Sequence, residues 1–438
     1  MNAIDQRDVP AADVNSADAG KVSPHARRTL WLLFLVLTLN IVDRQVINVL
    51  ADPISRELDL SDTQLGLLTG LAFAIFYNLS GIPLGRLSDN PRTNRSWLIA
   101  GALSVWSTAT ALCGAATNYA HLLLARIGVA VSEAGCVPPG HSLIADIVPS
   151  SRRARALAIF GLGVPIGALI GKAGGGVLAE WFGWRAAFLI VGLPGLILAL
   201  VFIASVREPR RSAPVEERRR LPFPAVLKII FASRALVYMT LGTASAMLLV
   251  TGGSVWGMIH FLRNHHLDTA TAGVWLGLSG GIAGVTGTWL GGWMADRYGR
   301  RNPRLYMLPP MLAMLASVPL LFFAWYAQDW RVALILLFLP DMFDNMYYGG
   351  TFTSLQLLVP PETRATVTAC FLFVVTMVGT GFGALSFGIA SDWLKPMAQG
   401  SESVRWVLMG AAILYVIPAL CYWRASIHLG RELQAETD

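Results

Sequence analysis

The chain has 438 residues, of which 54% are hydrophobic and 14% are charged, and its formal net charge is +7. Soluble domains carry about 25% charged residues, so this composition, with a mean hydropathy of +0.55, excludes an ordinary soluble protein. The four cysteines lie in apolar segments without metal-type spacing, and we expect no metal site and no cofactor.

Twelve apolar runs are long enough to span a bilayer, for which about 20 residues are needed. They cover residues 29–50, 63–85, 96–117, 120–146, 153–179, 185–206, 233–262, 269–293, 304–327, 332–357, 364–391 and 403–425. This pattern predicts an all-α, multi-pass membrane protein with twelve transmembrane helices. Residues 1–28 lack the short apolar core of a signal peptide, so we expect a disordered cytoplasmic tail there.

Basic residues are distributed unevenly between the two sides of this arrangement. Of the 34 Lys and Arg residues, 25 fall on the side that carries both termini, six on the opposite side and three within spans. Because positive charge is retained in cytoplasmic loops, we expect both termini to be cytoplasmic. The basic surplus is therefore a signal of topology, and we expect no nucleic-acid partner.

The first span contains a polar stripe. An Asp or Arg near the centre of a spanning helix costs about 2.5 to 3.5 kcal/mol, so such residues usually face a water-filled cavity. On a helix, the side chains of the stripe share an arc of about 140°. They are Asn40, Asp43, Arg44, Ile47 and Asn48.

The fourth span holds a second charged pair, Arg126 and Glu133, seven residues apart and hence on one helix face. If Glu133 can meet an arginine, its protonation depends on whether that arginine is engaged elsewhere. Such a dependence is what proton coupling requires, so Glu133 is a candidate for coupling. A static buried ion pair between the first and fourth spans is the alternative.

An internal duplication divides the chain. The segment from Gly85 to Asp89 recurs from Gly292 to Asp296, and the offset of 207 residues also relates Gly66 to Gly273. Two six-helix bundles follow from this repeat. We expect a tail at 1–28, an amino-terminal bundle at 29–206, a cytoplasmic linker at 207–232, a carboxy-terminal bundle at 233–425 and a tail at 426–438.

The repeated loops carry candidate gating residues. Asp89 and Asp296 lie at cytoplasmic helix ends beside arginines, where a carboxylate can meet a helix amino-terminus of the facing half. We expect this pairing to hold an inner gate shut. The candidate gating residues are Asp89, Arg95, Asp296, Arg300 and Arg364.

The carboxy-terminal half has fewer charges within its spans. In the tenth span, Asp341, Asp344 and Tyr348 share one arc with Asn345 and Phe352, and this span occupies the position equivalent to the Arg126–Glu133 helix. Further substrate contacts are expected from Asn40, Asn48, Tyr77, Trp256, Asp344 and Tyr348. Whether Asp341, Asp344, His141 or Lys172 takes part in coupling stays open at this level.

The repeated Gly-x-x-[Ser/Ala]-Asp pattern, the segment from Gly161 to Gly167 and the segment from Trp184 to Phe188 resemble motifs of the major facilitator superfamily. This resemblance implies two pseudo-symmetric bundles that work by alternating access. Three further segments are similar to the Spinster-like transporters of that superfamily: 43–47, 62–70 and 126–134.

The Spinster resemblance implies a lipid-like or lysolipid substrate and proton coupling. Carried over by motif position, Asp43 and Glu133 become proton carriers, and Arg44 and Arg126 become headgroup contacts. The same charges also resemble those of proton-coupled symporters of organic anions, which is the alternative. A membrane sensor that moves nothing is a remote alternative, and no nucleophile–base spacing or phosphate loop indicates an enzyme.

We thus expect a multi-pass protein of a bacterial inner membrane, monomeric in the lipid bilayer. Its partners would be protons and a small-molecule or lipid substrate. These patterns do not determine the substrate, the direction of transport, the choice between symport and antiport, or the resting conformation.

Overall fold

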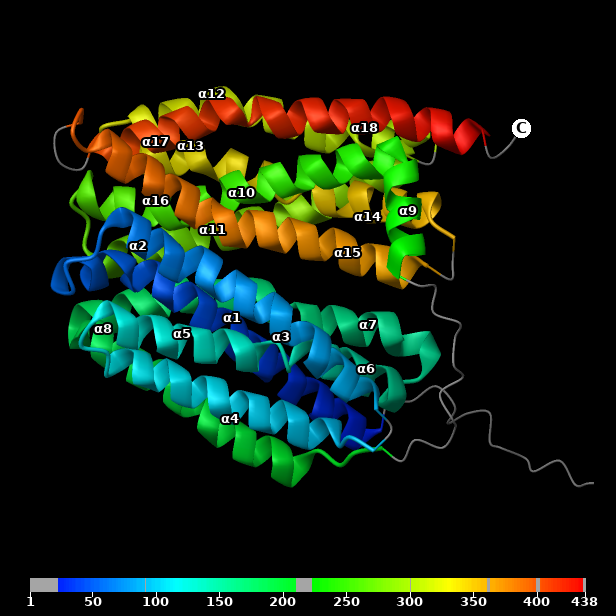
Figure 1. The fold of residues 1–438 in the computed structure, drawn as a ribbon, viewed down its shortest axis with the longest axis horizontal. Coiled ribbons are helices and arrows are strands. Elements are labelled where there is room, and N and C mark those ends of the chain that lie inside the picture. Colours follow the sequence, from blue (N-terminus) through cyan, green and yellow to red (C-terminus); the bar gives the residue numbers. More distant parts are fainter. Residues whose placement is uncertain are drawn as a thin grey trace, which may run out of the picture.

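The structure is a computed structural model that describes residues 23–90, 92–209, 223–299, 301–360, 363–398 and 402–435. All regular secondary structure in these ranges is helical. Figure 1 shows the helices gathered into two bundles, one from each half of the chain, with their long axes roughly parallel.

The amino-terminal bundle contains eight α-helices and one π-helical segment, η1. Their bounds are α1 (Pro24–Glu57), α2 (Asp62–Gly66), η1 (Leu67–Leu71), α3 (Ala72–Asp89), α4 (Arg95–Gly114), α5 (Tyr119–Glu133), α6 (Val137–Ile147), α7 (Ser150–Gly161) and α8 (Gly163–Ser205).

The carboxy-terminal half contains ten α-helices and three short segments of π- or 3₁₀-helix. Their bounds are α9 (Phe223–Ala232), α10 (Arg234–Arg263), α11 (Thr269–Met294), η2 (Ala295–Gly299), η3 (Pro303–Tyr306), α12 (Leu308–Tyr326), α13 (Trp330–Phe343), α14 (Tyr347–Leu358), α15 (Arg364–Thr376), η4 (Met377–Phe382), α16 (Gly383–Leu394), α17 (Glu402–Leu414) and α18 (Val416–Ala435).

These elements make the twelve crossings that the sequence predicts. Nine helical segments in the described ranges are long and apolar enough to cross a membrane. One of them, Arg155–Ser205, crosses twice, because Gly183 within α8 has a φ of 77° and reverses the chain. Before Gly183 the helix follows α1, and after it the helix returns along α4. α11, and α13 with α14, supply the other two crossings.

The fourth and tenth spans are broken at matching positions. α5 ends at Glu133 and α6 begins at Val137, directly before Pro138-Pro139, while α13 ends at Phe343 and α14 begins at Tyr347. Proline cannot continue the hydrogen-bond ladder of the preceding helix, which explains the first break. Both breaks follow a carboxylate, so the duplicated halves preserve an interruption next to a charged side chain.

The structure differs from the expected domain boundaries at both tails and in the linker. α1 begins at Pro24, where the hydroxyl of Ser23 caps the amide of Ala26, so the expected disorder of 1–28 is wrong for its last residues. The linker contains α9, and α18 continues through the expected tail to Ala435. Residues 1–22, 210–222 and 436–438 lie outside the described ranges.

Glycines allow close helix contacts within and between the bundles. A Cβ at Gly167 in α8 would lie 2.6 Å from the carbonyl oxygen of Thr38 in α1. A Cβ at Gly66 in α2 would lie 2.5 Å from the carbonyl oxygen of Ala384 in α16. Small residues at these positions let backbones pack directly, as in other membrane helix pairs.

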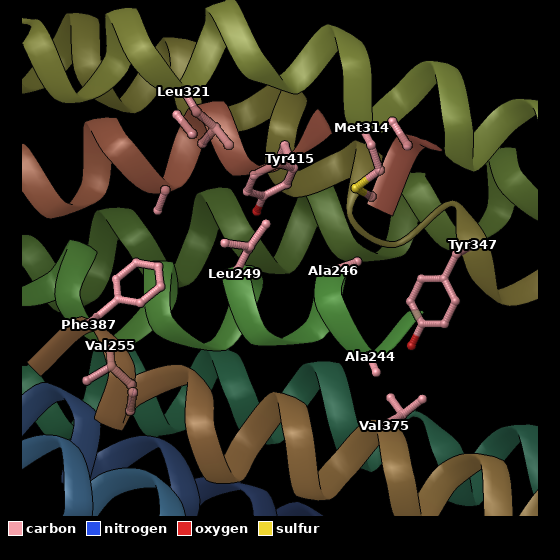
Figure 2. Packing of buried hydrophobic residues seen from close by; sticks show 14 of the residues in the cluster. Ala244, Ala246, Leu249, Val255, Met314, Leu321, Tyr347, Val375, Phe387 and Tyr415 are labelled. Atoms are coloured by element: carbon pink, nitrogen blue, oxygen red, sulfur yellow. The ribbon is translucent and has the colours of Figure 1, made fainter. Parts of the chain in front are cut away.

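The carboxy-terminal bundle has a continuous apolar core around α10. Figure 2 shows Leu249 and Val255 of α10 near Phe387 of α16 and Tyr415, the residue between α17 and α18. These side chains are at most 4% exposed. This core gives the carboxy-terminal bundle its own packed interior. The charged cluster described below belongs to the other bundle and lies outside this core.

Candidate functional site

An ion pair joins the first and fourth spans. The Nε of Arg44 in α1 lies 2.7 Å from Oε2 of Glu133 at the end of α5. Glu133 is fully buried, whereas the Arg44 side chain remains 26% exposed. The structure thus brings together two residues 89 positions apart that the polar patterns of their helices single out separately.

Two further predicted residues, Asp43 and Arg126, complete this cluster. The hydroxyl of Thr110 in α4 donates to Oδ2 of Asp43 at 2.8 Å, and Asp43 interacts electrostatically with Glu133 and Arg126. Asp43 and Arg126 are each 2% exposed. Two carboxyls and two guanidinium groups therefore share one buried region, which satisfies the charge balance that a low-dielectric site requires.

Several polar atoms of this cluster have no hydrogen-bond partner among the described residues. They are both side-chain polar atoms of Asn40, Oδ1 of Asp43, Oε1 of Glu133, and Nε and Nη1 of Arg126. Buried polar groups are normally paired. This concentration of free donors and acceptors in one place is the signature expected of a site that receives a ligand, water or a proton.

Aromatic rings form one side of the cluster. The guanidinium of Arg44 lies 4.4 Å from the ring centroid of Tyr77 and 4.9 Å from that of Phe73, and the guanidinium of Arg126 lies 5.2 Å from Phe73. Phe73 and Tyr77 stack on each other in α3. The rings hold both arginines by cation–π attraction while leaving their N–H groups available.

The remaining predicted substrate contacts are more dispersed. Asn48 is half-buried in α1, one turn beyond Arg44. In the tenth span, Asp344 accepts a hydrogen bond from the hydroxyl of Tyr415 at 3.3 Å, and Tyr348 stacks on Tyr347 and remains 41% exposed. The structure does not record a contact between these residues and the Arg44–Glu133 pair.

Trp256 is enclosed between helices in this structure. Its side chain is 1% exposed, and its indole N–H donates to the carbonyl oxygen of Ala384 at 2.8 Å. Its only polar atom is therefore satisfied by backbone, and the ring packs between α10 and α16. A role for Trp256 in substrate binding stays a prediction.

The predicted inner gate is described only in part. The side chain of Asp89 and all of Arg300 lie outside the described residues. Asp296 is exposed in the π-helical segment η2, and the Nε of Arg364 donates to the carbonyl oxygen of Val359 at 3.1 Å. The pairing of these residues across the bundles stays a prediction.

In this structure Arg95 has all its recorded partners within its own bundle. It is fully buried, and it pairs with Asp146 of α6 at 2.7 Å and with Glu208 after α8 at 2.5 Å. Its Nη1 also donates to Ser142. All these partners belong to the amino-terminal half, so Arg95 ties α4 to α6 and to the end of α8 and does not reach across to the other bundle.

A network that the sequence analysis did not predict joins the bundles at their opposite end. We call this end of the molecule the outer end, because the excess of Lys and Arg residues marks the opposite end as cytoplasmic. It lies at the left of Figure 1, where α1 and α10 end. The guanidinium of Arg263 in α10 meets Asp52 of α1 at 2.5 Å and Asp62 of α2 at 3.0 Å. Both carboxylates are almost fully buried.

Asp62 and Thr63 of α2 also contact residues at and directly after the end of α16. The hydroxyl of Thr63 donates to Asp392 at 2.6 Å, and Lys395 contacts both Asp392 and Asp62. Partial burial opposes the charge of Lys395, but these two carboxylates raise the pKa of its ammonium, which therefore stays protonated. The outer end is thus closed by ion pairs between the two bundles.

The sequence model described as Major Facilitator Superfamily matches residues 33–384. The chain belongs to the major facilitator superfamily. It is 32% identical over 439 residues to an MFS-type efflux pump of Mycolicibacterium smegmatis, covering 97% of this chain and 98% of the relative. It is 24% identical over 419 residues to protein spinster homolog 1 of Xenopus tropicalis, covering 90% and 79%.

A solved structure agrees with this assignment. The crystal structure of a bacterial homologue of the human lysosomal transporter Spinster, inward-facing and unoccupied, matches with a TM-score of 0.85. The identity is 27%, and the match covers 94% of this chain and 99% of the other. This member of the superfamily is therefore a Spinster-like transporter and not an enzyme, as the sequence predicts.

Several residues of the site were not predicted, because their sequence context gives only a weak indication of function. Phe73 and Thr110 look like ordinary apolar and small polar residues of a span, and only their neighbours give them a role. Arg263 and Lys395 appear in the sequence as outer-loop charges of no special kind. Asp62 and Thr63 stand at a helix start within the Spinster-like segment 62–70, and that position could have marked the outer network.

Proposed function

We propose that this Spinster-like transporter is a proton-coupled secondary carrier that works by alternating access and moves an amphiphilic, lipid-like substrate. The observation that carries the proposal is the contact between Arg44 and Glu133 beside Asp43 and Arg126. Because the Arg44 side chain is partly exposed, it can leave Glu133 for another partner, which a fully enclosed arginine could not do.

The coupling step follows from charge balance. While Glu133 is ionised, it holds Arg44, and a proton on Glu133 removes that attraction. Arg44 is then free to bind an anionic substrate group, with Arg126 beside it on the same aromatic wall. Asp43 can accept the proton or return it, because its carboxyl adjoins that of Glu133. Proton binding at Glu133 would thus favour substrate binding at Arg44, and by reciprocity bound substrate would favour the proton on Glu133.

The two ends of the molecule would supply the gates. The ion pairs of Arg263 and Lys395 hold the outer end closed in this structure, as expected for a state that opens to the inside. We propose that Asp89 and Asp296, with the neighbouring Arg300 and Arg364, close the inner end in the other state. Rocking of the bundles would exchange one set of contacts for the other.

The substrate class is supported by the relatives and by the asymmetry of the site. The matched relatives include Spinster homologues and a protein named as an efflux pump. Both cluster arginines lie in the amino-terminal bundle, while α10 carries no charged residue between Arg234 and His260. A headgroup on one side and an apolar tail on the other would suit such a site. A bacterial inner membrane and a monomeric state belong to the same proposal.

The test is flux in proteoliposomes under an imposed pH gradient. A panel of lysophospholipids and sphingoid bases is compared with a panel of small organic anions. We expect saturable, gradient-driven flux of the lipid panel, lost in Asp43→Asn and in Glu133→Gln but retained in Asp329→Asn, which makes the same change at the outer surface. Accumulation that persists in both site variants would refute the coupling, and preference for the anion panel would refute the lipid assignment.

A further inference from the structure

One charged side chain crosses from the amino-terminal bundle into the other. Lys172 of α8 donates from its Nζ to the hydroxyl of Ser254 in α10 at 3.3 Å. It also interacts electrostatically with Asp341 of α13. Its backbone is packed against α11, since a Cβ at Gly273 would meet the Lys172 carbonyl oxygen. The sequence alone left the role of Lys172 open, and the structure places its ammonium between the bundles.

The carboxyl groups near this ammonium are only partly satisfied. Asp341 lies beside Asp344, whose Oδ2 accepts from Tyr415 while its Oδ1 has no partner among the described residues. Asp344 is 7% exposed, so the free oxygen is buried. Lys172, Ser254 and Asp341 are each only half-buried, which leaves the ammonium and its nearer carboxylate within reach of a ligand.

Helix geometry places these groups at the depth of the proton-coupling cluster. Arg263 of α10 contacts Asp52 of α1 at the outer end. Ser254 and Asp43 each stand nine residues back from that contact along their own helices, which is about 13.5 Å of helix rise in both cases. The Lys172 ammonium therefore lies level with Asp43 and Arg44, on the opposite side of the interface between the bundles.

We infer that Asp341 and Asp344 form a binding subsite for an ammonium group, and that the side chain of Lys172 occupies it as a tethered competitor when no ligand is bound. A substrate ammonium would displace Lys172 from Asp341. Because Lys172 belongs to the other bundle, this displacement would also release one contact between the bundles. The inference deepens the proposed function by giving the substrate of this site a cationic group.

The arrangement favours a competitor over a permanent ion pair. A buried ion pair repays its desolvation only with good geometry and additional hydrogen bonds. Lys172 has one hydrogen bond, to a neutral hydroxyl and at 3.3 Å. Asp341 meanwhile faces a second carboxyl group that adds negative charge. A ligand ammonium with three donors and free approach could satisfy more of these oxygens than the tethered side chain does.

The test measures binding of a small probe to the purified full-length chain and does not depend on transport. The probe is n-butylammonium chloride, and 1-butanol serves as the neutral probe of equal chain length. Binding is read as the rise in melting temperature with probe concentration, since a ligand of the folded state stabilises it. The variants are Lys172→Met, which removes the competitor, Asp341→Asn, which removes the acceptor, and Asp329→Asn as the matched control.

We expect Lys172→Met to bind n-butylammonium about tenfold more tightly than the unmodified chain, the scale of one charge-assisted interaction. Asp341→Asn, alone or with Lys172→Met, should lose this binding, and Asp329→Asn should not. Binding of 1-butanol should be equal in all of them.

If Lys172→Met melts at a lower temperature than the unmodified chain, Lys172→Gln serves as a second variant for the same measurement. An unchanged affinity in both Lys172 variants, or full binding by Asp341→Asn, would overturn the inference. Absence of proteoliposome flux would instead count against the proposed function.

Discussion

The Nε of Arg263 lies 2.5 Å from Oδ1 of Asp52, and this contact joins the last turn of α10 to the outer part of α1. The same guanidinium reaches Asp62 and the hydroxyl of Ser55. A single residue of the carboxy-terminal bundle thus engages two buried carboxylates of the other bundle. This arginine is therefore one of the residues through which the two bundles close the outer end.

Arg263→Gln should open the outer end. The substitution leaves Asp52 without its cross-bundle cation and leaves Asp62 with Lys395 alone. Hydrogen bonds to charged groups contribute about 1.5 to 3 kcal/mol each. We expect the equilibrium to shift toward an outward-open state by about tenfold or more. Spin labels at Ala120→Cys and Met397→Cys, with the four native cysteines replaced, would report a new population at longer distance. Arg331→Gln, also at the outer end, should leave the distances unchanged.

Arg44→Lys should keep the charge and weaken transport. Lysine lacks the planar group that lies against Phe73 and Tyr77 while donating to Glu133. We expect proton-driven flux to fall by about tenfold, because a cation–π contact and a charged hydrogen bond are each worth roughly 1 to 2 kcal/mol here. Arg424→Lys, which makes the same change beside Trp423 at the end of the last span, is the control. Equal flux in the two variants would show that Arg44 acts only as a point charge.

Gly66→Ala should disturb closure of the outer end and not the stability of a bundle. The added methyl would press on the carbonyl of Ala384, and that contact exists only while the bundles meet. The spin-label pair should therefore report opening, with a small change in melting temperature. Gly101→Ala, where nothing lies within 4 Å of the added Cβ, should be neutral or stabilising by up to about 1 kcal/mol. Loss of folded protein in Gly66→Ala alone would contradict this reading.

Arg95→Met should destabilise the amino-terminal bundle without opening either end. The change leaves Asp146 and Glu208 without their shared cation, and we expect a loss of about 2 kcal/mol, since Asp146 is partly exposed. Thermal unfolding in detergent would measure it, with the exposed Arg92→Gln as control. A shift in the spin-label distances at an unchanged melting temperature would instead support the prediction that Arg95 is a gating residue.

Several features of the site were predictable because the membrane makes polar residues costly. Asp43, Arg44, Arg126 and Glu133 stand out in the sequence since nothing except function or pairing explains charges in apolar spans. The structure brings these four together. Phe73 and Thr110, which hold Arg44 and Asp43, were not predictable, because an aromatic or threonine residue in a span has many ordinary uses.

Some contacts could not be predicted, because the partner of a residue cannot be read from its own sequence neighbourhood. Trp256 stands in a span beside small residues, as a cavity residue would, but a carbonyl of α16 satisfies its indole. Arg95 follows a loop that resembles a gate, but Glu208 and Asp146 hold it inside one bundle. In both cases the deciding contact comes from a segment more than 50 positions away.

The sequence by itself determined the twelve spans, the duplicated halves, the family and the four charges of the amino-terminal cluster, because hydrophobic length and the cost of buried charge are local quantities. The tertiary structure decided which charges meet. It paired Arg44 with Glu133, closed the outer end through Arg263, and carried Lys172 across to Asp341. Such pairings depend on how helices from two bundles approach each other, and that approach is set by packing over the whole molecule.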